Sequence, residues 1–180
     1  MRGTLRITKL LFRQNAIKIG IWLFSIVATT IGVAVAYGDV YKTKADLQAS
    51  AFTMANPAMQ AMLGPGYSIE NYNLGAAFAS EMLLFTAIAI AIMNILFVSS
   101  STRKDEEEGR LEMIRALPTG RLSYMAASGV MMVIINLLLY LTISLGLGLI
   151  GQEGMSWESS FLYGAILAST GLQLREVLAR

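Results

Sequence analysis

The sequence predicts an all-α fold: a polytopic helical membrane protein with three full spans, a short fourth span, an outer two-helix loop and a short cytoplasmic helix. Composition is the first reason. Of the 180 residues, 55% are hydrophobic and only 14% are charged, whereas soluble domains carry about a quarter charged residues. The second reason is that the apolar residues form long blocks rather than an amphipathic spacing. The mean hydropathy is accordingly high, at +0.58.

Three apolar blocks are long enough to cross a bilayer, because a hydrocarbon core of about 30 Å needs about 20 residues of helix. The predicted spans are residues 19–37, 74–101 and 122–150. The first and third contain no charge, and the second contains only Glu81. A fourth block, 161–180, follows an outer turn at 151–160 and reaches Arg175 early for a comfortable crossing. We expect it to be a short or truncated span whose terminal arginines can snorkel to the headgroups.

Basic residues set the predicted orientation. Residues 1–18 and 102–121 hold five basic residues each, whereas 38–73 holds two and 151–160 holds none. Lys and Arg are favoured on the cytoplasmic side of a membrane. The N-terminus and residues 102–121 are therefore predicted to be cytoplasmic, and residues 38–73 extracellular.

Residues 1–18 mix basic and apolar side chains ahead of the first span. Two interpretations stay open: an elbow-like helix that lies in the cytoplasmic interface, or a basic flank of the span itself. A signal peptide cleaved after Ala34–Ala36 is a third alternative. Both the apolar core and the basic lead are longer than a signal peptide needs, which counts against cleavage.

Residues 38–73 are predicted to form two short helices on the outer ends of the spans. Thr43 and Asp46 have the spacing of a capping box, and Asn56-Pro57 can cap and open a second helix. An apolar stripe at helical spacing follows the capping box. It consists of Leu47, Ala51, Met54, Ala58 and Met62. Packing against the spans is the expected role, and a lid that contacts substrate is the alternative.

Residues 102–121 connect the second and third predicted spans and carry a dense group of charges. Opposite charges four residues apart, as at Lys104 and Glu108, and acids in the first turn favour a short helix. Leu111, Ile114 and Leu117 fall on one face of it. This pattern fits a solvated connector as well as a helix that docks on a soluble partner.

Residue types that the sequence lacks exclude several kinds of chemistry. Without Cys there is no disulfide framework, and without His the commonest metal ligand and general base is missing. No phosphate-binding P-loop occurs, so the chain cannot hydrolyse ATP by that route. A GxGxxG pattern at Gly146–Gly151 lies inside an apolar run and indicates glycines that pack helices. We expect no enzyme activity, cofactor, metal or nucleic-acid partner for this chain.

Three polar side chains in the predicted spans are candidates for a substrate path or gate. They are Glu81, Asn94 and Asn136. The alternative for Glu81 is a place at the wet interface, where a charge needs no function. The alternative for the two asparagines is a hydrogen bond between helices.

The predicted cytoplasmic segment also carries a resemblance. Glu-Glu-Gly-x-Leu-Glu-x-Ile at Glu107–Ile114, followed by Leu-Pro-x-x-Arg at Leu117–Arg121, resembles the coupling-helix region of ABC exporter permeases of the type-2 superfamily. In that family the segment follows the second span and docks on the ATP-binding subunit.

The outer loop and second span carry a closer resemblance, to bacterial permeases described as exporters of polyketides and other antibiotics. The loop matches at Asn56–Met59, Met62–Pro65, Tyr67 and Asn71-Tyr72, and the span at Leu74–Phe85. The likeness extends through Gly171, and beyond it the sequence departs from the apolar continuation of these permeases. The chain therefore resembles the N-terminal portion of a longer permease.

The resemblance implies a permease subunit of an ATP-driven exporter that moves apolar or amphipathic compounds out of a bacterial cell through its plasma membrane. ATP and Mg would be bound by a separate ABC ATP-binding subunit, and a further permease polypeptide or a second copy would complete the pathway. The residues implied in coupling to the ATPase are Glu107, Glu108, Leu111, Glu112, Ile114 and Leu117. The alternative is a non-transporting membrane scaffold or sensor whose cytoplasmic loop binds another soluble protein.

Overall fold

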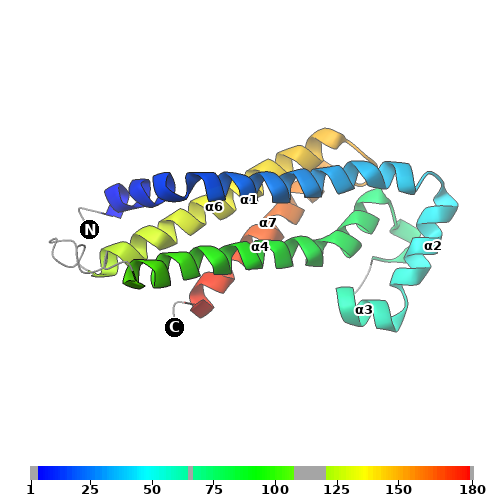
Figure 1. Cartoon of the computed structure of the whole chain (residues 1–180). Coiled ribbons are helices and arrows are strands. Elements are labelled where there is room, and N and C mark those ends of the chain that lie inside the picture. Colours follow the sequence, from blue (N-terminus) through cyan, green and yellow to red (C-terminus); the bar gives the residue numbers. More distant parts are fainter. Residues whose placement is uncertain (1–3, 65–66, 108–120, 179–180) are drawn as a thin grey trace.

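The computed structural model describes residues 4–64, 67–107 and 121–178, with side chains over 7–64, 67–99 and 126–173. Every regular element in these residues is helical. Four long helices run along the molecule: α1 (Thr4–Val40), α4 (Leu74–Glu107), α6 (Arg121–Ile150) and α7 (Trp157–Leu178). Successive long helices point in opposite directions (Figure 1). The all-α prediction is confirmed.

Three of these helices have the length and composition of membrane spans: Ile7–Val40, Leu74–Ser99 and Ala126–Ile150. Large apolar side chains on their outer faces are exposed. They include Ile17, Ile21, Phe24, Phe85, Ile92 and Leu137. A row of such side chains would be costly in water and is favourable against lipid tails. The polytopic membrane class is therefore confirmed.

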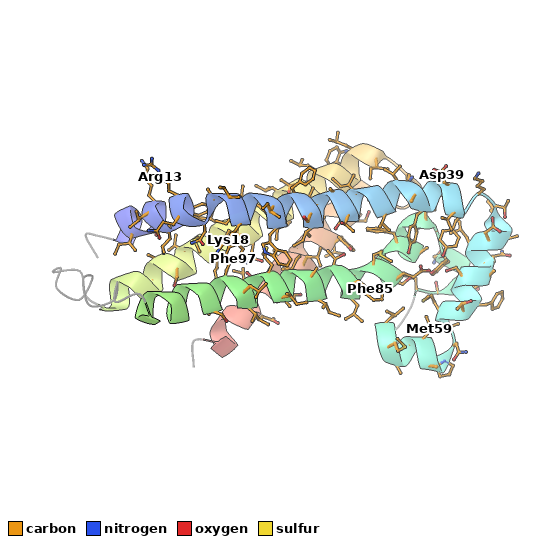
Figure 2. The ribbon with its side chains drawn as sticks, in the orientation of Figure 1. Arg13, Lys18, Asp39, Met59, Phe85 and Phe97 are labelled. Carbon is orange, nitrogen blue, oxygen red and sulfur yellow. The ribbon has the colours of Figure 1, made fainter. Side chains whose placement is uncertain are left out.

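Helix α1 continues without a break through residues 4–40. The predicted interfacial segment, which the structure describes from Thr4 to Lys18, and the predicted first span are thus parts of one helix. Figure 2 shows Arg13 on the outside of α1 near one end of the molecule and Asp39 near the other. Of the two interpretations left open, a basic flank of the span describes this geometry better than a separate helix.

The loop between α1 and α4 contains α2 (Lys44–Met54), α3 (Pro57–Leu63) and a 3-10 turn, η1 (Ile69–Asn71). The predicted capping box is present: the Thr43 hydroxyl accepts from the Asp46 N–H, and the Asp46 carboxylate accepts from the Thr43 N–H. Asn56 caps α3, with Pro57 in its first turn. Both caps confirm the predicted two-helix loop.

The predicted apolar stripe is only partly right. Leu47, Ala51 and Met54 on α2 are buried, but Ala58 and Met62 on α3 are exposed. The reason is the break at Asn56-Pro57, which restarts the helix in a new direction, so that its apolar side no longer faces the spans. α2 is therefore the docked helix of the loop, and α3 has no buried residue.

Two predicted boundaries shift. α7 begins at Trp157 instead of residue 161, because the Ser156 hydroxyl accepts a hydrogen bond from the Ser159 N–H (3.3 Å), as an N-cap does. The turn before it narrows to 151–156, where Gly151 adopts φ 65°. α4 extends through Glu107, so the first residues of the predicted coupling helix prolong the second span. The rest of that prediction lies outside the described residues.

The core lies where the four long helices meet, with α6 packed on α1 and α7, and α4 packed mainly on α7. Its most buried large side chains are Ile90, Met93, Met131, Ile135, Leu139, Ile143 and Leu167. Two of the three glycines of the predicted packing motif have the expected role: a Cβ on Gly146 would collide with the Ile31 side chain, and one on Gly148 would lie 2.5 Å from the Trp157 ring. The prediction is wrong for Gly151, which has nothing within 4 Å of an added Cβ and lies in the turn after α6. Gly146 and Gly148 permit the close approach of α6 to its neighbours.

Candidate functional site

The end of the bundle that carries α2 and α3 holds a cluster of polar side chains centred on Glu81. Three hydroxyls donate to its carboxylate: Tyr37 (2.6 Å), Ser50 (2.9 Å) and Tyr41 (3.2 Å). Hydrogen bonds to an ionised group are stronger than neutral ones. The carboxylate thereby connects α1, α2 and α4.

The cluster extends further through hydroxyls alone. Ser50 Oγ lies 3.3 Å from Tyr72 Oη, which lies 3.2 Å from Ser80 Oγ. Burial raises the pKa of Tyr41 above its ordinary value, against an opposing effect of Ser50, and the nearby Glu81 carboxylate raises it further. Tyr41 is therefore a neutral donor at physiological pH.

Glu81 is half-buried in this cluster. It stands near the end of the bundle, as expected if it lies at the wet interface. It is nevertheless surrounded by donors from α1, from α2 and from Tyr41 in the loop between them, rather than left in open solvent. Among the residues that the structure describes, no three acidic side chains gather as a metal site would require.

Asn94 and Asn136 form a reciprocal pair deep in the bundle. Each amide donates to the other, at 3.3 Å from Asn94 and 3.0 Å from Asn136, and both side chains are almost fully buried. Each also donates to the backbone carbonyl four residues earlier on its own helix. The alternative of a hydrogen bond between helices thus describes the pair, and it links α4 to α6.

The residues predicted to couple to an ATPase cannot be placed. The backbone of Glu107 ends α4, and Glu108, Leu111, Glu112, Ile114 and Leu117 fall outside the described residues. What the structure does place is the pair of helix ends that flank them. These ends lie beside the N-terminal end of α1, opposite α2 and α3 (Figure 1).

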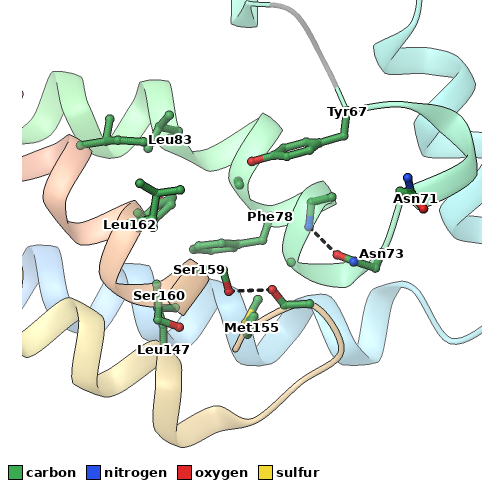
Figure 3. Close-up of a pocket in the computed structure, with 16 residues that line it drawn as sticks. Tyr67, Asn71, Asn73, Phe78, Leu83, Leu147, Met155, Ser159, Ser160 and Leu162 are labelled. Atoms are coloured by element: carbon green, nitrogen blue, oxygen red, sulfur yellow. Dashed lines mark hydrogen bonds between the residues drawn. The ribbon is translucent and has the colours of Figure 1, made fainter. Parts of the chain in front are cut away.

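Two cavities lie at the flanks of α4. The first, of about 190 Å³, is bounded by α4, α7, the end of α6 and the loop around η1. Figure 3 shows Phe78 and Leu162 on its wall, with Tyr67 and Asn73 at the loop side. The Asn73 side chain accepts from the Ala76 N–H at 2.9 Å, which caps the start of α4.

The second cavity, of about 250 Å³, lies between α1 and α4. Its walls are apolar, as at Trp22 and Phe85, but several hydroxyls also line it. These are Ser25, Thr29, Thr30 and Thr86. The hydroxyls of Thr30 and Thr86 donate to carbonyls of their own helices, Ile26 (2.7 Å) and Met82 (2.9 Å). The wall is therefore mostly apolar, and the hydroxyls of Thr30 and Thr86 already have acceptors.

Sequence reasoning missed most of these residues. Tyr37 and Tyr41 stand four apart at the end of the first span, a spacing that puts both hydroxyls on one helix face toward Glu81. That pattern could have pointed to the cluster. Nothing local marks Ser50, Tyr72 or Phe78.

Fold and site together define the class: a polytopic helical membrane protein with small apolar cavities between its spans. Comparison with known proteins then gives the family. Residues 8–178 match the model described as "Multidrug efflux system permease Rv1217c, C-terminal domain", and the chain belongs to this family of efflux permeases. The permease resemblance found in the sequence is confirmed.

One relative agrees with this assignment. The multidrug efflux system permease protein Rv1217c of Mycobacterium tuberculosis (strain ATCC 25618 / H37Rv) is 33% identical over 186 residues. The match covers 98% of this chain and 31% of the relative, so the chain spans about a third of that protein's length. The sequence resembled the N-terminal portion of a longer permease, whereas the matching family model is described as a C-terminal domain. Both comparisons point to efflux permeases.

Proposed function

We propose that this chain is a permease subunit of an ATP-driven exporter in the bacterial plasma membrane, and that it moves apolar or amphipathic compounds outward. The observation that supports the proposal is which segments lie at each end of the helix bundle. The α4 and α6 ends that flank residues 108–120 lie with the basic N-terminal end, and α2 and α3 lie opposite (Figure 1). Since basic residues favour the cytoplasm, the segment that resembles a coupling helix is available to a cytoplasmic ATP-binding subunit.

The continuity of α4 supports a mechanism. It runs unbroken from Leu74, beside the Glu81 cluster, to Glu107. A movement that the ATPase imposes at Glu107–Leu117 would therefore pass along α4 to the outer end of the bundle. ATP binding would close the partner ATPase, and the spans would rearrange to expose the compound outside. ATP and Mg stay with that partner, and this chain performs no chemistry itself.

A second membrane polypeptide, or a second copy of this chain, completes the pathway in this proposal. Large apolar side chains are exposed around the described helices, which leaves faces for lipid and for further helices. α7, at about 33 Å for its 22 residues, is long enough to act as the fourth span and return the chain to the cytoplasmic side.

The coupling role can be tested in cells. With Glu107, Glu108 and Leu111 all replaced by alanine, we expect the chain to insert normally but to lose at least about 90% of ATP-dependent export, since acids and an apolar anchor would be missing from the ATPase contact. The readout is accumulation of Nile red, an apolar dye, in cells that carry the complete transporter. A triple replacement on the opposite end, Glu70, Lys42 and Gln60 to alanine, is the matched control. Unchanged export by the coupling variant would contradict the coupling role of these residues.

A further inference from the structure

The two cavities have one wall in common. Phe78 lines both of them. The ring is 2% exposed, so it fills the space between the cavities and is not itself in the open. Helix α4 thus lies between a groove shared with α1 and a pocket shared with α7, and Phe78 is the α4 side chain that reaches both.

The contacts of Phe78 show what holds this wall closed. Its ring lies 5.3 Å, centroid to centroid, from Tyr163 on α7 and 5.6 Å from Tyr37 on α1. The Tyr163 hydroxyl lies 3.3 Å from Thr86 Oγ1, within hydrogen-bond distance. Tyr163 lines the first cavity and Thr86 the second. Phe78, Tyr163 and Thr86 therefore stand together between the two cavities.

Each cavity alone is too small for a drug-sized molecule, so the wall between them limits what can bind. Binding pockets for drug-sized molecules measure about 300–1,000 Å³. The cavities, of about 190 and 250 Å³, each fall below that range, and an apolar cavity of about 150 Å³ holds one benzene ring. Joined, the two volumes would enter the drug-sized range.

We propose that Phe78 divides one drug-sized binding region into two, and so sets the length of compound that the region accepts. The ligand class is an elongated, mostly apolar molecule with two ring-sized parts. Hydroxyls such as Ser25 and Thr29 on one side, and Asn71 on the other, can meet a polar group at either end. Rotation of Phe78 away from Tyr163 joins the cavities. The transport role of the region rests on the proposed function, whereas ligand binding needs no ATPase.

Native tryptophan provides the test. The chain has two tryptophans; Trp22 lines the second cavity, and Trp157→Phe leaves it as the sole tryptophan. The purified full chain in lipid nanodiscs is titrated with bromobenzene, which has one ring, and with 4-bromobiphenyl, which has two. Bromine quenches tryptophan on contact. We expect bromobenzene to quench Trp22 saturably, and Phe78→Ala to raise the affinity for 4-bromobiphenyl about tenfold or more, because a second buried ring becomes available. The affinity for bromobenzene should change less than about threefold.

Ala79 lines the first cavity only, so Ala79→Phe in the Phe78→Ala background should fill the added space and remove the gain. Ala28→Phe, on the exposed side of α1, is the control and should leave the gain in place. Phe78→Leu, a milder truncation, should give an intermediate gain and keeps the test usable if alanine prevents folding. Equal 4-bromobiphenyl affinity with and without Phe78, a gain that survives Ala79→Phe, or no saturable quenching by bromobenzene would each overturn the proposal. None of these outcomes bears on ATP coupling, which the coupling variant tests separately.

Discussion

Gly171→Ala is expected to destabilise the helix bundle by about 1–3 kcal/mol, the usual cost of overpacking a core. A Cβ at Gly171 on α7 would lie 2.8 Å from Asn94 Nδ2 and closer still to Asn136 Oδ1. The added methyl group must therefore part the asparagine pair or push α7 away from it. Parting the pair breaks buried hydrogen bonds between α4 and α6, and a buried amide that loses its partner is costly. Pushing α7 away gives up its packing on α4 and α6.

A glycine-to-alanine substitution at an open position of the bundle should not lower its stability. Gly32 lies inside α1, about two turns before its C-terminal end, with nothing within 4 Å of an added Cβ. Ala is favoured over Gly in a helix by about 0.5–1 kcal/mol, so Gly32→Ala should be neutral or stabilising. Thermal unfolding in detergent, followed by circular dichroism, compares the two variants with the parent chain. Equal changes in thermal stability for Gly171→Ala and Gly32→Ala would show that the close contact of α7 with the asparagine pair does not limit the size of residue 171.

Glu81→Gln is expected to release α2 from the spans without unfolding them. Glutamine keeps the size of the side chain but replaces one acceptor oxygen with an NH2 group and removes the charge. Tyr37 donates to one carboxylate oxygen, and Tyr41 and Ser50 donate to the other, so either orientation of the amide leaves a hydroxyl without its acceptor. Hydrogen bonds to charged groups contribute about 1.5–3 kcal/mol, a large fraction of the local stability of a helix of 11 residues.

Hydrogen exchange reports this release directly. Amides of α2 should exchange about tenfold faster or more in Glu81→Gln, as expected for a loss of at least 1.4 kcal/mol, while amides in the middle of α4 and α6 keep their rates. Glu70→Gln removes the same charge from an exposed residue of η1 and should change neither region. Unaltered exchange of α2 in Glu81→Gln would mean that Leu47, Ala51 and Met54 hold the helix by apolar packing alone.

Much of the fold could be predicted because its determinants are local. The length of an apolar block is enough to predict a span. The capping box at Thr43 and the Asn56-Pro57 cap depend on residues within three positions of each other. The start of α7 was also marked locally, by Ser156 ahead of Trp157, but the apolar block placed it later. Caps therefore give helix boundaries more sharply than hydropathy does.

The functional candidates depend on distances that no local pattern contains. Glu81 meets Tyr37 across 44 positions and Ser50 across 31. A lone acid in a span predicts that partners are needed, but which hydroxyls supply them follows from how α1 and α2 fold over α4. The role of Phe78 is even harder to predict from the sequence, since it depends on the packing of three helices around one ring.

The claim on which the rest depends is that the two ends of the bundle face opposite sides of the membrane, with α2 and α3 outside and residues 102–121 in the cytoplasm. The chain has no native cysteine, so single cysteines at Lys44, which is exposed at the start of α2, and at Arg110 can be labelled without background. In intact cells, a membrane-impermeant maleimide should label the Lys44→Cys variant, and the Arg110→Cys variant should react only after the membrane is permeabilised. Labelling of Arg110→Cys but not Lys44→Cys in intact cells would invert the topology and contradict the coupling role of residues 107–117.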